Sequence, residues 1–341
     1  MSNDDLRELN DANRNSVGGT EITTKQIYDG TIPRELLEQF QIVPSRIREL
    51  DESRIRIYHG HDLPWDPEVA RLKDPEFRAK FHKMVFSSEW QYSLYQTILG
   101  VEFSERCAVI EPGIVPGSGW PGIDGKSDLP VHLAYASTPQ RGLEILVPVF
   151  ERLAAEDPDV RLHVHSSFKL YGWGESDKRY EPLFDKVRAH PQMIYHGFTP
   201  HDKLMDSFQS YHVLAYPCTW LETSCRVLTE AMSAGLVAVH PNLGALPYTG
   251  GGLTHVYQGD SNPQIHAELH YKALKEAVGL WRTDREGLID YLRDTKAYAD
   301  ARFNVDTVRA DWQELLTSLA AKYPTVESRK FPAQMFRYST G

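Results

Sequence analysis

Apolar runs alternate with amphipathic segments through the second half of the chain. The runs 131–135 and 213–216 are each followed by a polar loop. A segment with apolar residues at helical spacing then follows, as in residues 143–155. Strand-then-helix units of this length predict a parallel sheet with right-handed crossovers. The pattern therefore predicts an α/β domain in this part of the chain.

A shorter strand pattern in the first third of the chain ends in two histidines. Residues 54–58 alternate between basic and apolar side chains, and His59, His61 and Asp62 follow. Open α/β sheets place their ligands at the carboxyl ends of strands, which makes this loop a candidate site. The alternatives are a zinc site, which would need further ligands, and a solvent-facing loop.

Glycine and proline mark the boundary between two domains. Residues 116–128 are rich in both, which is typical of a linker. We therefore expect a first domain over residues 1–125 and a second over 126–323. Residues 263–302 and 306–322 have apolar positions at helical spacing, so we expect helices there.

Composition excludes several classes of protein. The chain has 341 residues and a formal net charge of −10, which disfavours nucleic acid as a partner without excluding a local basic groove. The three cysteines have no metal-binding or disulfide spacing and fit a reducing compartment. No apolar run has the length of a membrane span, and the acidic, polar start does not resemble a signal peptide. We expect a cytoplasmic protein.

Two glutamates follow the strand at residues 213–216. Pro217 stops this strand, and Thr223 or Ser224 is positioned to cap a helix that ends before Gly235. Glu222 would then lie in the loop and Glu230 two turns inside the helix.

The start of this helix is a candidate diphosphate site. The amides of Thr223, Ser224 and Cys225 would point out of the helix start, where hydrogen bonds and the helix dipole favour an anion. Glu230 would reach ribose hydroxyls, and Glu222 would approach a sugar ring. The alternative is an ordinary strand–loop–helix unit with solvated carboxylates.

This stretch resembles a known family. Glu222 and Glu230, followed by Ala-Met-Ser-Ala-Gly, are similar to the signature of retaining glycosyltransferases of the family-four type. The resemblance implies a GT-B fold, in which two Rossmann-like domains with parallel sheets face a central cleft. It also implies that Glu222 contacts the donor sugar and that Glu230 binds the ribose. The chain departs from the family at residues 222–225, where Glu-Thr-Ser-Cys replaces the frequent Glu-Gly-Phe-Gly.

The resemblance extends to the first domain. Gly18 and Gly19 resemble the family's N-terminal glycine loop, which faces the donor phosphates, and Thr20 could cap a helix running towards residue 40. The family's hydrophobic first strand is missing from residues 1–15, so we expect a trimmed domain. His61 matches the histidine that touches the donor sugar, with His59 as the second choice.

Further positions of the second domain resemble the donor site. Gly197, Phe198 and Thr199 are expected to line the pocket for the base, while Asn242 and Gly244 belong to a loop that would close over the sugar. The last segment of GT-B proteins often crosses back to the first domain, so we expect residues 324–341 to pack there.

Arg141 is the candidate phosphate clamp, because a guanidinium offers two parallel donors. In the resemblance it stands where the family has a lysine. Ala136 stands where the family has an arginine, and Lys169 or Arg226 could replace that cation. The alternative is a solvated arginine.

The resemblance implies sugar transfer from a nucleoside-diphosphate sugar to an acceptor hydroxyl with retention of configuration. A UDP-sugar is favoured by family frequency alone, and the acceptor is not indicated. We expect no metal and no other cofactor. One alternative is a transferase acting on hydroxymethylpyrimidine-type DNA bases. The other is a catalytically inactive protein that only binds a nucleotide sugar.

Overall fold

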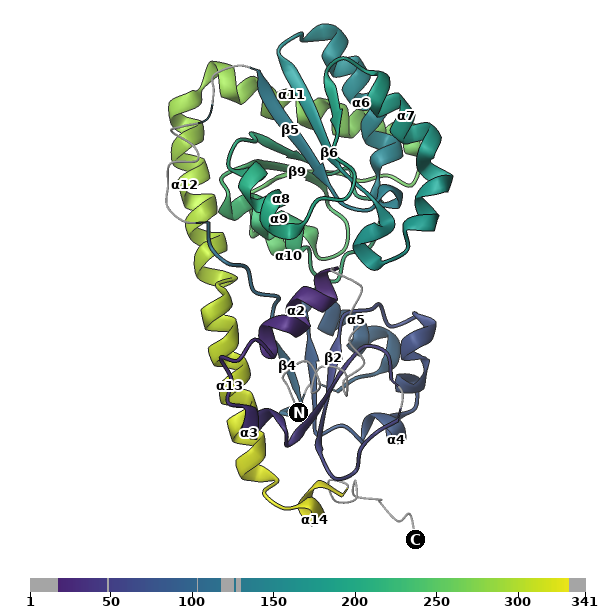
Figure 1. Ribbon diagram of the computed structural model, residues 1–341, viewed down its shortest axis with the longest axis vertical. Helices are drawn as coiled ribbons and strands as arrows, with labels where there is room; N and C mark the ends of the chain where they lie inside the picture. Colours follow the sequence, from purple (N-terminus) through teal and green to yellow (C-terminus); the bar gives the residue numbers. More distant parts are fainter. Residues whose placement is uncertain (1–17, 48, 103, 118–125, 127–129, 331–341) are drawn as a thin grey trace. The chain divides into compact units, whose positions relative to one another are not determined.

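The computed structural model describes residues 18–47, 49–102, 104–117, 126 and 130–330, and its elements form two compact units (Figure 1). Unit 1 comprises Gly19–Gly113 and the chain from Val305 onward, and unit 2 comprises Ile114–Asn304. The boundary expected at residue 125 lies outside the described residues. The chain enters unit 2 already at Ile114 and returns to unit 1 at Val305, because helix α13 packs on the sheet of unit 1.

Unit 1 contains a parallel sheet of four strands in the order β1-β2-β3-β4. The strands are β1 (Phe40–Pro44), β2 (Ile55–Gly60), β3 (Lys83–Phe86) and β4 (Cys107–Val109). The helices are α2 (Gly19–Ile27), α3 (Arg34–Leu37), η1 (Pro67–Lys73), α4 (Pro75–Arg78), α5 (Glu89–Leu99), α13 (Val305–Lys322) and α14 (Val326–Arg329). The helix expected to run from Thr20 towards residue 40 ends at Ile27, and the short helix α3 and then β1 follow it.

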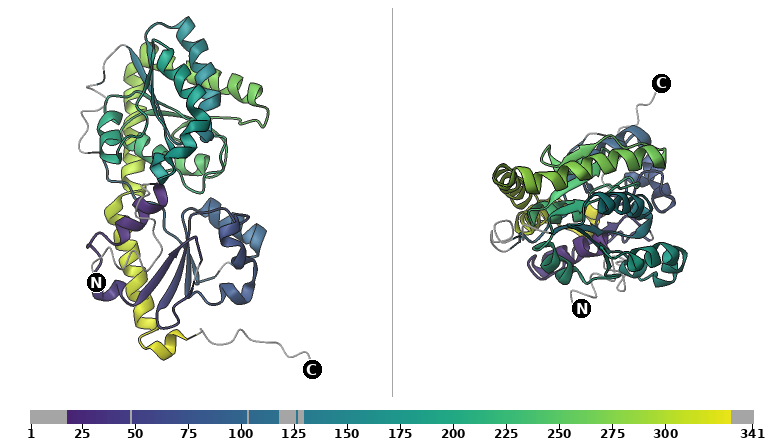
Figure 2. Two further views of the ribbon diagram at one scale, coloured as in Figure 1. Left: turned by 45° about the vertical axis from the view of Figure 1, so that its right-hand side comes forward. Right: turned by 90° about the horizontal axis from the view of Figure 1, so that it is seen from above.

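Both faces of this sheet are buried, as the alternation of β2 requires. Ile55 and Ile57 pack against Trp312 and other apolar residues of α13 on one face. Tyr58 packs on the opposite face in a cluster with Phe81. Figure 2 shows α13, in yellow-green, and the helices α4 and α5, in blue, on opposite sides of the strands. The result is a three-layer unit in which β2 is covered on both sides.

Arg329 ties the end of the described chain to unit 1. Its guanidinium donates hydrogen bonds to the carbonyl oxygens of Tyr323 (3.0 Å) and Ser53 (3.2 Å) and to Oε1 of Gln39 (2.9 Å). The buried Arg56 in turn donates to the carbonyl oxygen of Arg329 at 3.0 Å. Residues 324–330 therefore contact unit 1, and residues 331–341 of the expected tail lie outside the described part.

Unit 2 contains a parallel sheet of six strands in the order β10-β9-β8-β5-β6-β7. The strands are β5 (Val131–Ala136), β6 (Val160–His165), β7 (Met193–Tyr195), β8 (Val213–Ala215), β9 (Val237–Pro241) and β10 (His255–Tyr257). The helices are η2 (Pro139–Arg141), α6 (Leu143–Glu156), η3 (Phe168–Tyr171), η4 (Gly174–Tyr180), α7 (Glu181–Ala189), α8 (His201–Phe208), α9 (Arg226–Ser233), α10 (Leu246–Gly250), α11 (Pro263–Thr283) and α12 (Arg285–Arg302).

The sheet of unit 2 is the α/β sheet expected from the sequence. The helices α6, α7 and α11 pack beside one another, and Figure 1 shows α6 and α7 beside β5 and β6. The strands β5 and β8 lie next to each other although 76 residues, 137–212, separate the end of β5 from the start of β8. None of the helices in the described ranges combines the length and the apolar character that crossing a membrane requires.

The Arg329→Ala variant is expected to lose about 1–3 kcal/mol of unfolding free energy, because three hydrogen bonds of a mostly buried guanidinium disappear. Urea unfolding followed by circular dichroism measures this loss. Lys330→Ala removes an exposed ion pair with Glu327 and serves as the control, with an unfolding curve expected to match that of the unmodified protein. Equal unfolding curves for both variants would contradict the role of Arg329.

Candidate functional site

Three loops meet at the carboxyl edge of the sheet in unit 2. They follow the adjacent strands β8, β5 and β6. Open α/β sheets bind their ligands at this edge, where loops from neighbouring strands surround a crevice. The loops carry Glu222, Arg141 and Tyr171, so residues far apart in the sequence come together here.

Arg141 and Glu222 form a largely buried ion pair. Nη1 of Arg141 lies 2.6 Å from Oε1 of Glu222, which also accepts a hydrogen bond from the hydroxyl of Tyr216 at 2.7 Å. Nη2 of Arg141 donates to the hydroxyl of Tyr171 at 3.3 Å. Burial opposes the charge on Arg141, but the carboxylate of Glu222 outweighs it and raises the pKa of the guanidinium well above its usual value. Arg141 therefore stays charged at neutral pH.

Two glycines allow the neighbouring backbone to approach the loop that carries Glu222. Gly142 has φ 111°, and a Cβ there would lie 2.0 Å from the carbonyl oxygen of Pro217. Gly244 has φ 60°, and a Cβ there would lie 2.8 Å from the backbone nitrogen and oxygen of Glu222. The amide of Ala245 donates to that oxygen at 2.9 Å. The loop is thus packed against backbone at both ends, which fixes the position of Glu222.

Glu230 binds a different pair of basic side chains. Its Oε1 lies 2.7 Å from Nε of Arg226 and 2.7 Å from Nε2 of His201. Burial opposes ionisation of this carboxyl, but Arg226 and His201 outweigh it and lower the pKa of Glu230. Arg226, a candidate for the missing phosphate cation, is therefore already paired with a carboxylate.

The helix that carries Glu230 begins later than expected. It starts at Arg226, with Cys225 as an N-cap that makes no side-chain hydrogen bond, so the expected start at Thr223 or Ser224 is wrong. Thr223, Ser224 and Cys225 belong to the preceding loop. Cys225 is buried with extended backbone, and Glu222 earlier in the same loop is paired with Arg141.

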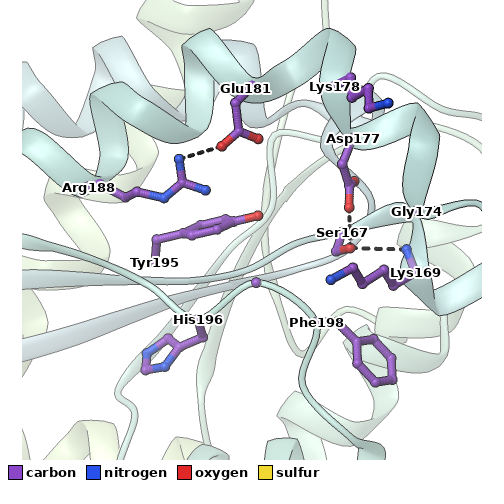
Figure 3. Close-up of a pocket in the computed structure, with 11 residues that line it drawn as sticks. Ser167, Lys169, Gly174, Asp177, Lys178, Glu181, Arg188, Tyr195, His196 and Phe198 are labelled. Atoms are coloured by element: carbon purple, nitrogen blue, oxygen red, sulfur yellow. Dashed lines mark hydrogen bonds and ion pairs between the residues drawn. The ribbon is translucent and has the colours of Figure 1, made fainter.

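A pocket of about 500 Å³ lies beside these loops, after β6 and β7. Gly197 and Phe198 line it, as does Lys169, whose ammonium forms no ion pair with any residue that the structure describes. Figure 3 shows Lys169 and Phe198 on one side of the pocket and Tyr195 on the other. Thr199 is not among the lining residues and instead makes a 2.7 Å hydrogen bond with Nδ1 of His165.

The two histidines of the first-domain candidate site lie in unit 1, at the end of β2. Their rings are 4.1 Å apart, and Nδ1 of His61 lies 3.4 Å from Oγ of Ser87. Burial lowers the pKa of His61 to about 4, and burial together with His61 lowers that of His59 well below its usual value. Within the described ranges, no group of three histidine, cysteine or acidic residues could hold a metal ion.

The two glycine candidates, Gly18 and Gly19, are backbone positions at the start of the described chain. Gly19 begins α2, and Gly18 is the buried residue before it. Sequence reasoning missed Tyr216, Tyr171 and His201 as partners of the charged site. A tyrosine at the end of a buried strand is a weak signal, since it is also a common core residue.

The Gly142→Ala variant is expected to lose about 2 kcal/mol of unfolding free energy, because a Cβ would clash with Pro217 and the φ value disfavours alanine. Gly279→Ala in α11 is the matched control. It has open space around its Cβ and should gain up to about 1 kcal/mol from helix propensity. Chemical denaturation of both variants checks this, and a neutral result for Gly142→Ala would show that the loop can move aside.

The protein is expected to lose stability as the pH falls below about 6.5. Burial and neighbouring histidines lower the pKa values of His163 and His165 to about 3, and burial lowers that of His61 to about 4. These side chains stay neutral in the fold while the unfolded chain takes up protons below pH 6.5. Each can cost up to about 1.4 kcal/mol per pH unit. Urea midpoints at pH 7.5 and 5.5 measure the effect, and equal midpoints would contradict it.

The second unit matches a known protein family. Residues 133–249 match the glycosyl transferases group 1, a range that includes Arg141, Glu222 and Glu230. A comparison with curated proteins found no significant match.

Solved structures share the fold over most of the chain. A sucrose-phosphate synthase from Thermosynechococcus elongatus is 15% identical, with a TM-score of 0.62 over 83% of this chain and 74% of that one. A glycosyltransferase from Rickettsia africae is 13% identical, with a TM-score of 0.65 over 90% of this chain and 83% of that one. HepE of Anabaena, solved in complex with UDP, is 17% identical, with a TM-score of 0.58 over 88% of this chain and 77% of that one. The chain therefore has the GT-B fold of glycosyltransferases, and residues 133–249 match the model of the glycosyl transferases group 1.

Proposed function

We propose that the protein transfers a sugar from a nucleoside-diphosphate sugar, with UDP as the favoured nucleotide, to an acceptor hydroxyl with retention of configuration. The buried pair of Arg141 and Glu222 carries the proposal, because it lies at the ligand-binding edge of a sheet that matches a glycosyltransferase family. The similar HepE of Anabaena has been solved with UDP, with UDP and glucose, and with UDP-glucose, which supports the choice of nucleotide.

Arg141 and Lys169 are the cations for the diphosphate in this proposal. During transfer the bond between the anomeric carbon and the diphosphate breaks, and a bond to the acceptor oxygen forms on the same face of the sugar. Negative charge grows on the departing diphosphate, and its leaving oxygen takes up the proton that the acceptor hydroxyl gives up. Positive groups held in place before the reaction stabilise that charge most effectively. Arg141 is held in this way by Glu222 and Tyr171.

The two glutamates take separate parts in donor binding. Oε1 of Glu222 is occupied by Arg141 and Tyr216, and Oε2 makes no hydrogen bond within the described chain. Oε2 is therefore the oxygen that would orient sugar hydroxyls. Glu230, fixed by Arg226 and His201, would accept hydrogen bonds from the ribose.

A second candidate function is binding of a nucleotide sugar without turnover. Ala136 stands at the position of one expected arginine, and Arg226 is already paired with Glu230. The site therefore has fewer available cations than the resemblance implies. Release of nucleotide from the donor, measured with and without candidate acceptors, separates the two functions: tight donor binding without release leaves only the binding protein.

The Glu230→Ala variant is expected to bind the donor more weakly by about 1–3 kcal/mol, because the hydrogen bonds to the ribose disappear. Calorimetry with UDP-glucose measures this change, and a thermal melt without ligand checks that the variant is folded. Glu268→Ala, which removes an exposed glutamate on α11, is the control. Unchanged affinity in the folded Glu230→Ala variant would exclude the ribose role.

A further inference from the structure

Two exposed tryptophans flank the Arg141–Glu222 pair. Trp220 is 48% exposed and follows β8, while Trp173 is 52% exposed and follows β6. The ring of Trp220 lies 5.8 Å from the guanidinium carbon of Arg141. The ring of Trp173 lies 5.4 Å from that of Tyr171, whose hydroxyl accepts a hydrogen bond from Arg141. Trp220 thus lies next to the guanidinium of Arg141, and Trp173 lies next to the tyrosine that this guanidinium contacts.

The backbone under each tryptophan is anchored. The amide of Trp220 donates to Sγ of Cys218 at 3.4 Å, and Oγ1 of the neighbouring Thr219 donates to the carbonyl oxygen of Gln140 at 3.2 Å. The amide of Trp173 donates to the carbonyl oxygen of Phe168 at 3.1 Å. The rings therefore project from fixed loops. Binding of a ligand on them would cost little conformational entropy of the backbone, because the backbone is already ordered.

The surroundings of the rings combine an apolar face with strong hydrogen-bonding groups. Nε of Arg141 is buried and has no hydrogen-bond partner, and Oε2 of Glu222 makes no hydrogen bond within the described chain. A buried donor without a partner is costly, so a ligand group that satisfies it gains affinity. A sugar ring matches both features. Its C–H face can pack on an indole, while its hydroxyls can donate hydrogen bonds to a carboxylate and accept them from a guanidinium group.

We propose that Trp220 and Trp173 form a stacking surface for a pyranose ring of a saccharide substrate, next to the Arg141–Glu222 pair. The proposal deepens the proposed function and rests on it for the identity of the site. The pyranose has two sources, the sugar of the donor or a saccharide acceptor. A lipid chain would leave the charged pair unused. A nucleobase would stack on the same rings. In that case the alanine variants would lose affinity for UDP as well as for UDP-glucose.

The test compares Trp220→Ala and Trp173→Ala with Trp65→Ala. Trp65 is 50% exposed in unit 1 and is therefore a control for the loss of an exposed indole. Calorimetry and tryptophan fluorescence measure the affinities of UDP, UDP-glucose and maltotriose for the full chain. Trp220→Phe keeps an aromatic face and should retain most of the affinity that alanine loses.

A loss of about fivefold or more, the size of one aromatic contact, is expected in at least one alanine variant. A loss for UDP-glucose with unchanged UDP affinity assigns the surface to the donor sugar. A loss for maltotriose alone assigns it to a saccharide acceptor. Equal losses for UDP and UDP-glucose would overturn the proposal in favour of base stacking. Affinities that match the Trp65→Ala control for all three probes would also overturn it.

The proposed function can fail separately. If the unmodified protein binds maltotriose but neither UDP nor UDP-glucose, and Trp220→Ala or Trp173→Ala weakens that binding, the stacking surface stands and nucleotide-sugar transfer with UDP falls. If the unmodified protein binds none of the three probes, both are overturned for these ligands.

Discussion

The candidate site depends on one buried ion pair, between Arg141 and Glu222. Removing two charges from water is expensive, and a buried pair repays this cost only when hydrogen bonds satisfy both partners. Tyr216 and Tyr171 supply such bonds, one to each member of the pair. The pair also joins the loops after two adjacent strands, so the position of the carboxylate is set by tertiary structure and not by its own loop alone.

The separation of the two glutamates follows from this arrangement. Glu222 belongs to a network with Arg141, whereas Glu230 belongs to one with Arg226 and His201. Each carboxylate has its own basic partner within 2.7 Å, so neither requires a bound ligand to hold it in place. A substrate would therefore meet groups that the protein already holds in position, which is the condition for electrostatic stabilisation without reorganisation.

The sequence predicted the parallel sheet of unit 2 because strands such as Val131–Ala136 and Val213–Ala215 are apolar and are followed by loops and helices. It did not predict β1 (Phe40–Pro44), because Thr20 as a cap favoured a helix running towards residue 40. It placed Glu222 and Arg141 among the candidates separately. Their pairing spans 81 residues of sequence, and local patterns contain no information about such contacts.

The path of the chain through unit 1 has a consequence for synthesis on the ribosome. Unit 2 is continuous from Ile114 to Asn304 and can fold once that segment has emerged. Unit 1 begins first but stays incomplete, since Trp312 and Leu316 of its core arrive only with α13. One apolar face of its strands stays uncovered until α13 has been synthesised. Binding by a chaperone would matter most during this interval.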